Sequence, residues 1–280
     1  MIFNPTDFIN DKVKDMQPSG IRKFFDIVNE MDDAISLGVG EPDFTTPWHI
    51  REAGIYSLEK GHTYYTSNSG LMTLREEICN YVKKFNLDYT PNEALVTIGG
   101  SEAIDLAMRT FINPGDEVII HEPSFVCYKP CVALAGGKVV TIETKAENSF
   151  AVTKEELLEK ITPKTKMIVL SYPNNPTGAI MPKETLKEIA QIAIEHNLLV
   201  LSDEIYAELT YEGEHTSIAS FDGMKDRTLV VNGFSKAFAM TGWRLGFILG
   251  NNELIKAMTK VHQYAIMSAP TSAQYAAIEA

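Results

Sequence analysis

Short runs of apolar, mostly β-branched residues alternate with longer helix-like stretches through most of this chain. Such runs are typical of strands buried on both faces, and the stretches between them are long enough for crossover helices. The pattern therefore predicts an α/β fold with a mostly parallel, seven-stranded sheet flanked by helices. We expect strands at residues 95–98, 117–121, 138–142, 167–171, 198–202, 228–231 and 246–249.

Helices are expected in the intervals between these strands. Thr153 and Glu156 have the spacing of a capping box, and Pro182 suits the first turn of a helix. The predicted helices cover residues 101–111, 124–135, 153–160, 182–196 and 254–265. Residues 1–45 lack this alternation and are expected to form an arm that leads into the main domain.

The C-terminal residues have a different pattern. An Ala-rich helical stretch opens near Ser268, and the sequence stops inside it at Ala280. Natural domains seldom end within an uncapped helix, so we expect a chain that stops short of a complete fold.

Charge and composition exclude several classes of protein. The 280 residues carry a formal net charge of −12, which argues against nucleic-acid and anionic membrane partners. The chain has no apolar run of 18 residues and no signal-like N-terminus, so we expect a cytoplasmic protein without a membrane span. Its three cysteines and six histidines have no metal-ligand spacing, so no metal site is expected.

The first candidate site is a glycine-rich turn between a predicted strand and a helix. In open α/β sheets, ligands bind beyond the carboxyl ends of the strands. Glycine lets the backbone approach a ligand closely, and the following helix offers free N–H groups to an anion. A plain strand-to-helix turn is the alternative interpretation. The segment is Gly99-Gly100-Ser101-Glu102-Ala103.

Two further candidates follow other predicted strands. Pro173 and Pro176 restrict the backbone around Asn175, which would place its amide rigidly for a hydrogen bond to a cofactor, although a simple Asn-Pro turn is the alternative. Asp203 ends a buried strand and needs a partner, because an unpaired buried charge is costly. That partner could be a structural arginine or the protonated ring nitrogen of a cofactor.

The fourth candidate is Lys236, which follows a strand in a loop of small and apolar residues. Burial would lower its pKa and favour the neutral amine that Schiff-base chemistry requires. Arg244 lies eight residues further on and could bind a phosphate bidentately. The alternative is a lysine whose stem packs while its head reaches water. Taken together, the four segments offer what a pocket for pyridoxal 5′-phosphate (PLP) requires.

These motifs resemble those of the fold-type I, class I/II aminotransferases, which are PLP enzymes. The resemblance runs from about Ile35 to the last residue. It implies an arm and part of a small domain in residues 1–45, a large PLP-binding domain in 46–280, and a small domain left incomplete, since relatives continue for about one ordinary domain. The motifs are residues 40–44 (Gly-Glu-Pro-Asp-Phe), 175–178 (Asn-Pro-Thr-Gly), 203–206 (Asp-Glu-Ile-Tyr), and Ser235-Lys236 with Arg244.

The resemblance also implies roles for individual residues. Lys236 would be the Schiff-base lysine and proton shuttle, with Asp203 pairing with the pyridinium nitrogen. Asn175 and the catalytic Tyr206 would hydrogen-bond the ring's phenolic oxygen. Gly40 and Asn175 would contact the substrate. The remaining implied contacts at the phosphate are Gly100, the backbone of Ser101, Glu102 and Ala103, and Ser235 and Arg244. Phe125 would lie against the ring, and Tyr65 would reach the phosphate of a second subunit in a homodimer.

The chain departs from the family pattern in two respects. Gly233 stands where many relatives carry a phosphate-binding serine, which would leave more of that task to Ser101, Ser235 and Arg244. In addition, the arginine that grips the substrate carboxylate belongs to the C-terminal segment of relatives, and no residue here takes its role.

The implied activity is transfer of an amino group between an L-amino acid and a 2-oxo acid by a ping-pong mechanism. Two alternatives stay open: a PLP-dependent carbon–sulfur β-lyase, and an inactive PLP-binding or regulatory fragment. The residues 21–25 and the Pro123-Ser124-Phe125 segment resemble the aromatic and N-acetyl-diaminopimelate branch, while aspartate also stays open as a substrate.

Overall fold

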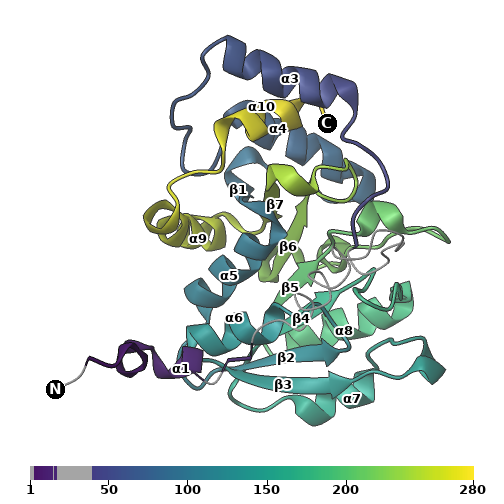
Figure 1. Cartoon of the computed structure of the whole chain (residues 1–280). Helices are drawn as coiled ribbons and strands as arrows, with labels where there is room; N and C mark the ends of the chain where they lie inside the picture. Colours follow the sequence, from purple (N-terminus) through teal and green to yellow (C-terminus); the bar gives the residue numbers. More distant parts are fainter. Residues whose placement is uncertain (1–2, 15, 18–39) are drawn as a thin grey trace, which may run out of the picture.

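A single mixed sheet organises the protein. The computed structural model describes residues 3–14, 16–17 and 40–280 (Figure 1). Its seven strands have the order β1-β7-β6-β5-β4-β2-β3, in which β7 is antiparallel to both neighbours and the other pairs are parallel. The predicted, mostly parallel α/β fold is confirmed. The strands are β1 (Ala94–Thr97), β2 (Glu117–Glu122), β3 (Lys138–Glu143), β4 (Thr165–Ser171), β5 (Leu199–Asp203), β6 (Thr228–Gly233) and β7 (Gly246–Leu249).

Both faces of the sheet are buried, which explains the continuous apolar strands. In β4, Met167 and Val169 join the core on one face, while Ile168 and Leu170 join the core on the other. Helices α5, α6 and α9 cover the first face, and α7 and α8 cover the second. These helices are α5 (Gly99–Phe111), α6 (Tyr128–Ala135), α7 (Lys154–Lys160), α8 (Lys183–Glu195) and α9 (Asn252–Ala265).

The helix prediction was wrong at the start of α6. That helix begins at Tyr128, and Ser124 to Val126 remain a loop, so the predicted start at residue 124 is four residues early. Besides the short α1 (Asp11–Lys14), two helices of the described part were not predicted, α3 (Trp48–Glu59) and α4 (Met72–Val82). Helix α3 leaves Trp48 and Tyr56 exposed, so its sequence has no clean separation of apolar and polar faces.

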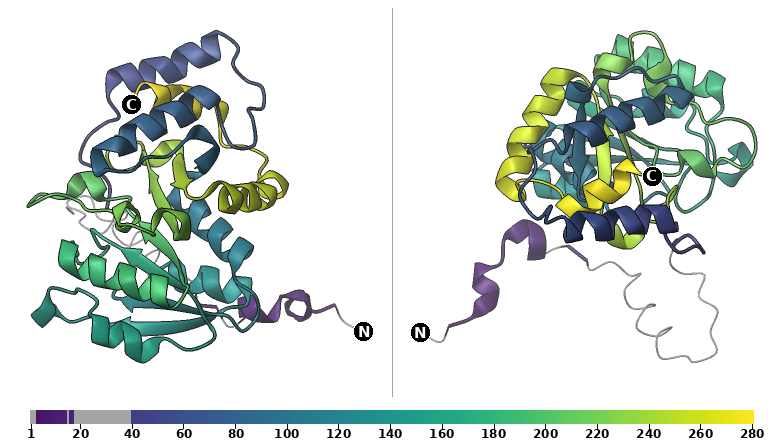
Figure 2. Two further views of the ribbon diagram at one scale, coloured as in Figure 1. Left: turned by 180° about the vertical axis from the view of Figure 1, so that it is seen from behind. Right: turned by 90° about the horizontal axis from the view of Figure 1, so that it is seen from above.

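The C-terminal helical pattern forms α10 (Thr271–Ile278), which packs against α3 and α4 beyond β1 and β7 (Figures 1 and 2). At the other end of the sheet, the short helix α1 (Asp11–Lys14) lies beside α6, where Lys12 Nζ donates to the Leu134 carbonyl at 3.2 Å. Within the described ranges, no helix combines the length and apolar character needed to cross a membrane. Residues 21–25 and Ile35 lie outside the described residues.

Candidate functional site

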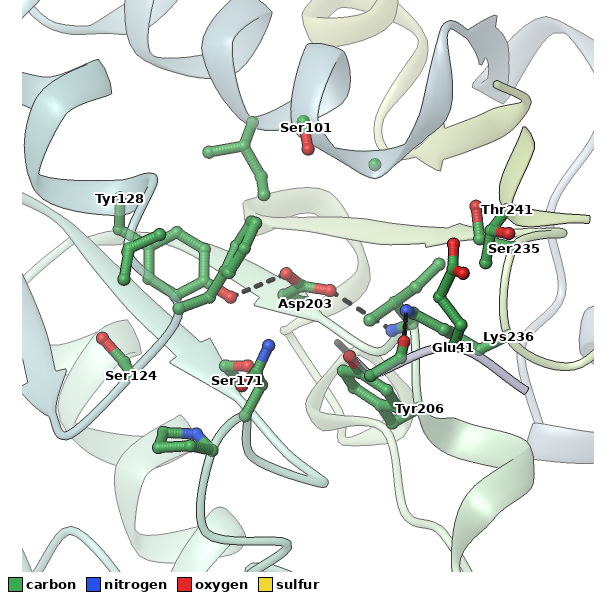
Figure 3. A pocket seen from close by; sticks show the side chains of 18 of the residues that line it. Glu41, Ser101, Ser124, Tyr128, Ser171, Asp203, Tyr206, Ser235, Lys236 and Thr241 are labelled. Atoms are coloured by element: carbon green, nitrogen blue, oxygen red, sulfur yellow. Dashed lines mark hydrogen bonds between the residues drawn. The ribbon is translucent and has the colours of Figure 1, made fainter. Parts of the chain in front are cut away.

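A cavity of about 610 Å³ lies at the carboxyl ends of β4, β5 and β6, beside the first turn of α5 (Figure 3). It brings together the four segments singled out in the sequence, because the ends of parallel strands meet at one edge of the sheet. The lining residues are Gly40, Glu41, Gly100, Ser101, Ile104, Ser124, Phe125, Val126, Tyr128, Ser171, Asn175, Pro176, Asp203, Ile205, Tyr206, Ser235, Lys236, Thr241 and Arg244.

Asp203 is the buried carboxylate of this cavity. It ends β5, is only 5% exposed, and lies opposite Ser171 in the register of β4 and β5. Tyr128 donates its hydroxyl to Oδ2 at 2.6 Å (Figure 3). The Ile205 N–H donates to Oδ1 at 3.2 Å. Burial raises the pKa of Asp203 to about 6, against these two hydrogen bonds, which lower it. Among the residues that the structure describes, no cationic side chain forms an ion pair with this carboxylate.

Lys236 extends into the same cavity from the loop after β6 (Figure 3). Its Nζ donates to the carbonyl of Gly40 and lies 5.6 Å from the centroid of the Tyr206 ring. Burial lowers the pKa of Lys236, the nearby Arg244 guanidinium lowers it further, and the Glu41 carboxylate opposes both. The lysine head therefore contacts cavity residues rather than only solvent, and its neutral form is favoured relative to a free lysine.

Arg244 and the first turn of α5 form one wall. A β-carbon added to Gly99, whose φ is +71°, would lie 2.9 Å from Arg244 Nη2. A β-carbon added to Gly246 in β7 would lie 2.6 Å from the Gly99 carbonyl carbon. Glycine at these positions therefore permits the close approach of helix, strand and guanidinium. The free N–H groups of the first helical turn and the arginine then face the same region, which suits an anion.

Asn175 and Tyr206 line the cavity near Asp203 and Lys236. Burial raises the pKa of Tyr206 and the Asp203 charge adds to this effect, while a side-chain hydrogen bond from Asn175 lowers the pKa. Phe125 comes from the loop before α6 and meets the Tyr128 ring edge-to-face at 5.8 Å between centroids. An aromatic wall and two hydrogen-bonding groups therefore border the space between the carboxylate and the amine.

Three of the predicted contacts lie outside the lining of the cavity. The Glu102 carboxylate points towards α9, where it contacts His262 Nδ1 at 2.8 Å, and it accepts the Ile98 N–H at 2.5 Å. Ala103 is completely buried in the core beneath α5. Tyr65 is 83% exposed. Their proposed contacts with a cofactor stay predictions.

Gly233 has a structural explanation. A β-carbon there would lie 2.9 Å from the Gly246 Cα in the neighbouring strand β7. The packing of β6 against β7 therefore leaves no room for a side chain at this position.

Sequence reasoning missed several lining residues, above all Tyr128, which was placed in a helix without a role. Glu41 and Ser124 lie within segments named above, Ser171 ends a predicted strand, and Thr241 lies between Lys236 and Arg244. The sequence attached no function to these four residues. The only sequence signal for Tyr128 is its place three residues after Phe125, close to a predicted strand end.

Comparison with known proteins identifies the family. Residues 32–280 match the family described as Aminotransferase class I and II. YugH of Bacillus subtilis is 55% identical over 276 residues, which are 98% of this chain and 72% of YugH. Aromatic-amino-acid aminotransferase 2 of Thermococcus litoralis is 44% identical, with 97% and 71% of the two chains covered. The structure of aspartate aminotransferase from Thermus thermophilus with maleate is 42% identical, covers 97% of this chain and 72% of that one, and superposes with a TM-score of 0.93. By sequence and by fold, this chain belongs to the class I and II aminotransferases, a family of PLP-dependent enzymes.

Proposed function

We propose that the cavity binds PLP between Lys236 and Asp203, and that the protein transfers an amino group from an L-amino acid to a 2-oxo acid. The observation that carries this proposal is the buried Asp203 carboxylate, which has no cationic partner among the described residues although it shares its cavity with a lysine amine. A protonated ring nitrogen would supply the missing positive charge.

The other cavity residues suit the remaining parts of the cofactor. Arg244, Ser235 and the first turn of α5 at Gly100 and Ser101 would hold the phosphate. Phe125 would pack against the ring. Asn175 lines the cavity, and the Tyr206 ring centroid lies 5.6 Å from Lys236 Nζ. Both side chains would hydrogen-bond the ring's phenolic oxygen.

When bound, PLP supplies an electron sink for the electrons left on the substrate α-carbon. Lys236 would hold the cofactor through its amine and would move the α-proton of the substrate. Its lowered pKa favours this task because only a neutral amine can accept a proton. Asp203 would keep the ring nitrogen protonated. Two such half-reactions, one for the amino acid and one for the 2-oxo acid, make a ping-pong transamination.

The relatives support an amino acid and a 2-oxo acid as substrates. They include an aromatic-amino-acid aminotransferase, aspartate aminotransferases, and a Thermus thermophilus tetra mutant complexed with tryptophan. Gly40 and Asn175 would contact the substrate in this chain. Aromatic amino acids and aspartate are therefore the first donors to test, and a screen of amino donors would distinguish them.

The proposal extends to assembly and location. Tyr65 and its neighbour Tyr64 are 83% and 81% exposed, and Tyr65 would reach the phosphate of a second copy in a homodimer. A cytoplasmic location accords with three cysteines that are free in the described structure. Residues 1–45 would form the arm and part of a small domain, and residues 46–280 the large domain.

The test is a titration of the purified protein with PLP, followed by its visible absorption and by borohydride trapping and peptide mapping. The expected result is cofactor attached at Lys236, with no attachment in Lys236→Ala. Attachment retained in that variant would refute the proposal. Pyruvate release from cystathionine without a 2-oxo acid acceptor would favour the β-lyase, and attachment without turnover of any donor would favour the inactive fragment.

A further inference from the structure

Tyr128 is completely buried, yet its hydroxyl reaches the cavity. It is the first residue of α6, and that helix packs on the same sheet face as α5. The hydroxyl donates to Asp203 Oδ2 at 2.6 Å, a length typical of a hydrogen bond to a charged oxygen (Figure 3). The phenol ring is held by the core and by the edge-to-face contact with Phe125. The donor is therefore rigidly placed.

Two donors determine how the Asp203 carboxylate lies. The Ile205 N–H occupies Oδ1 and the Tyr128 hydroxyl occupies Oδ2. A carboxylate has about four lone-pair sites, so each oxygen keeps acceptor capacity for a group in the cavity. Ser171 lies beside Asp203 across the β4–β5 pair and also lines the cavity. The Ser171 side chain is within hydrogen-bond reach of the Tyr128 hydroxyl.

We infer that Tyr128 is a positioning residue, whose hydroxyl holds the Asp203 carboxylate in the orientation and charge state that pair with a protonated ring nitrogen. The inference rests on the proposed function, since it concerns the same cavity. It assigns a function to a side chain of α6, which would act on the cofactor through the Asp203 carboxylate at the end of β5.

The charges around Asp203 explain why such a donor matters. Burial and the adjacent Glu204 carboxylate both favour the protonated form of Asp203. Cys127, before α6, and Tyr206, after β5, carry no positive charge that would oppose this effect. The cations of the cavity, Lys236 and Arg244, form no ion pair with Asp203 in the described structure. The Tyr128 hydroxyl and the Ile205 N–H are then the groups that favour the anion.

The experiment compares PLP with an analogue in which a carbon replaces the ring nitrogen. Both ligands keep the phosphate and the carbonyl, but only PLP can pair with Asp203. In Tyr128→Phe, we expect binding of PLP to weaken about tenfold and binding of the analogue to change less than about twofold, because only PLP pairs with the charged form of the carboxylate that the Tyr128 hydroxyl stabilises. The preference of the protein for PLP over the analogue should fall by the same tenfold.

Tyr172→Phe is the matched control. Tyr172 is also buried, and its hydroxyl donates to the Phe150 carbonyl at 2.9 Å, outside the cavity lining. This variant loses a tyrosine hydroxyl from the neighbouring strand end, so it should leave the preference for PLP unchanged. A fall in preference equal to that of Tyr128→Phe would overturn the inference.

A second variant covers the case in which Tyr128→Phe does not fold. Replacing Tyr128 alone by a ring-fluorinated tyrosine keeps its shape and makes the phenol a stronger donor, so the preference for PLP should rise. An unchanged or reduced preference, or an equal loss of both ligands in Tyr128→Phe, would overturn the inference. Failure of the wild-type protein to bind either ligand would instead refute the proposed function, and the inference with it.

Discussion

The guanidinium group of Arg244 lies so close to the backbone of Gly99 that a β-carbon on Gly99 would stand 2.9 Å from Nη2. Residues 145 positions apart in the sequence thus lie in contact, next to the cavity that Arg244 and Gly100 line. Arg244 itself has a left-handed backbone, with φ of 53°, at the end of the 3-10 turn Thr241–Trp243, and its Nη1 donates to the Thr241 carbonyl at 2.9 Å. A conformation this rare for a non-glycine residue is often retained where a side chain must be aimed at a ligand.

Gly99→Ala should weaken PLP binding about tenfold, because the new methyl group displaces the guanidinium or distorts the turn at a φ of +71°. Isothermal titration with PLP would measure the change. Gly61→Ala is the matched control, since Gly61 has a φ of +74° and a methyl group added there would have nothing within 4 Å. It shares the backbone cost, of about 1 kcal/mol, but should bind PLP normally. Equal affinities in all three proteins would contradict the assigned contact.

Asp203 should make the PLP-free protein less stable as pH rises through the range from about 4 to about 6. Its pKa is raised from 3.8 to about 6 by burial, so protonation favours the folded state. This stabilisation, on the order of 3 kcal/mol, is fully present below the pKa that Asp203 has in the unfolded chain. It is lost as pH rises through the pKa that Asp203 has in the folded protein. Urea unfolding of wild type and Asp203→Asn at pH 4 and pH 7 would measure it. The difference between the two proteins should change with pH in this direction, and a constant difference would count against it.

His121 should act in the opposite direction. It is 1% exposed, its Nε2 accepts the Ser171 N–H at 3.2 Å, and its ring stacks on Tyr172. Burial lowers its pKa from 6.5 to about 4, so the folded state favours the neutral ring. Its contribution is present above pH 6.5 and is lost as pH falls towards 4, again on the order of 3 kcal/mol.

The check on His121 is the same pair of unfolding experiments with His121→Gln, which cannot titrate. The variant should lose less stability than wild type between pH 7 and pH 4. Asp203→Asn, in contrast, should lose more than wild type over that interval, because it lacks the gain from Asp203 protonation. Parallel curves for wild type and His121→Gln would show that His121 titrates normally.

Thr153→Ala should destabilise the protein by about 1 kcal/mol without affecting PLP binding. The Thr153 hydroxyl accepts the Glu156 N–H at 3.3 Å, and the Glu156 carboxylate accepts the Thr153 N–H at 3.0 Å, which closes the capping box of α7. Thermal unfolding and a PLP titration would separate the two effects. Thr153→Ser keeps the hydroxyl and should retain most of the stability, whereas a loss as large as that of alanine would point to packing instead.

The sheet was predictable because strands buried on both faces consist of continuous apolar runs, which can be recognised in the sequence. All seven strands were placed within two residues of their observed ends, and the Thr153 capping box marked the start of α7 correctly. Helices α3 and α4 were missed because the local sequence does not show which of their side chains are buried. In α3, Trp48 and Tyr56 are exposed, so the periodic contrast that reveals a helix is weak.

The candidate site divides in the same way. Lys236, Asp203 and Asn175 were identified from the sequence because each lies at or after the end of a predicted strand and carries a polar group that needs a partner when buried. Arg244 was identified by its place eight residues after Lys236. Their roles towards a cofactor stay predictions. The sequence did not predict that α6 begins only at Tyr128 and that Phe125 lies in the loop before it. The local sequence pattern contains no signal for this helix start.

By itself, then, the sequence determined the order of strands and helices and the polar groups at the strand ends. Only the tertiary structure decided that Tyr128 faces Asp203, that Glu102 turns away to His262, and that Gly233 leaves room for β7. The physical reason is that periodicity and capping act between residues close in the chain. The direction of a buried side chain is decided by partners far away in the sequence, 75 positions for Tyr128 and 160 for Glu102.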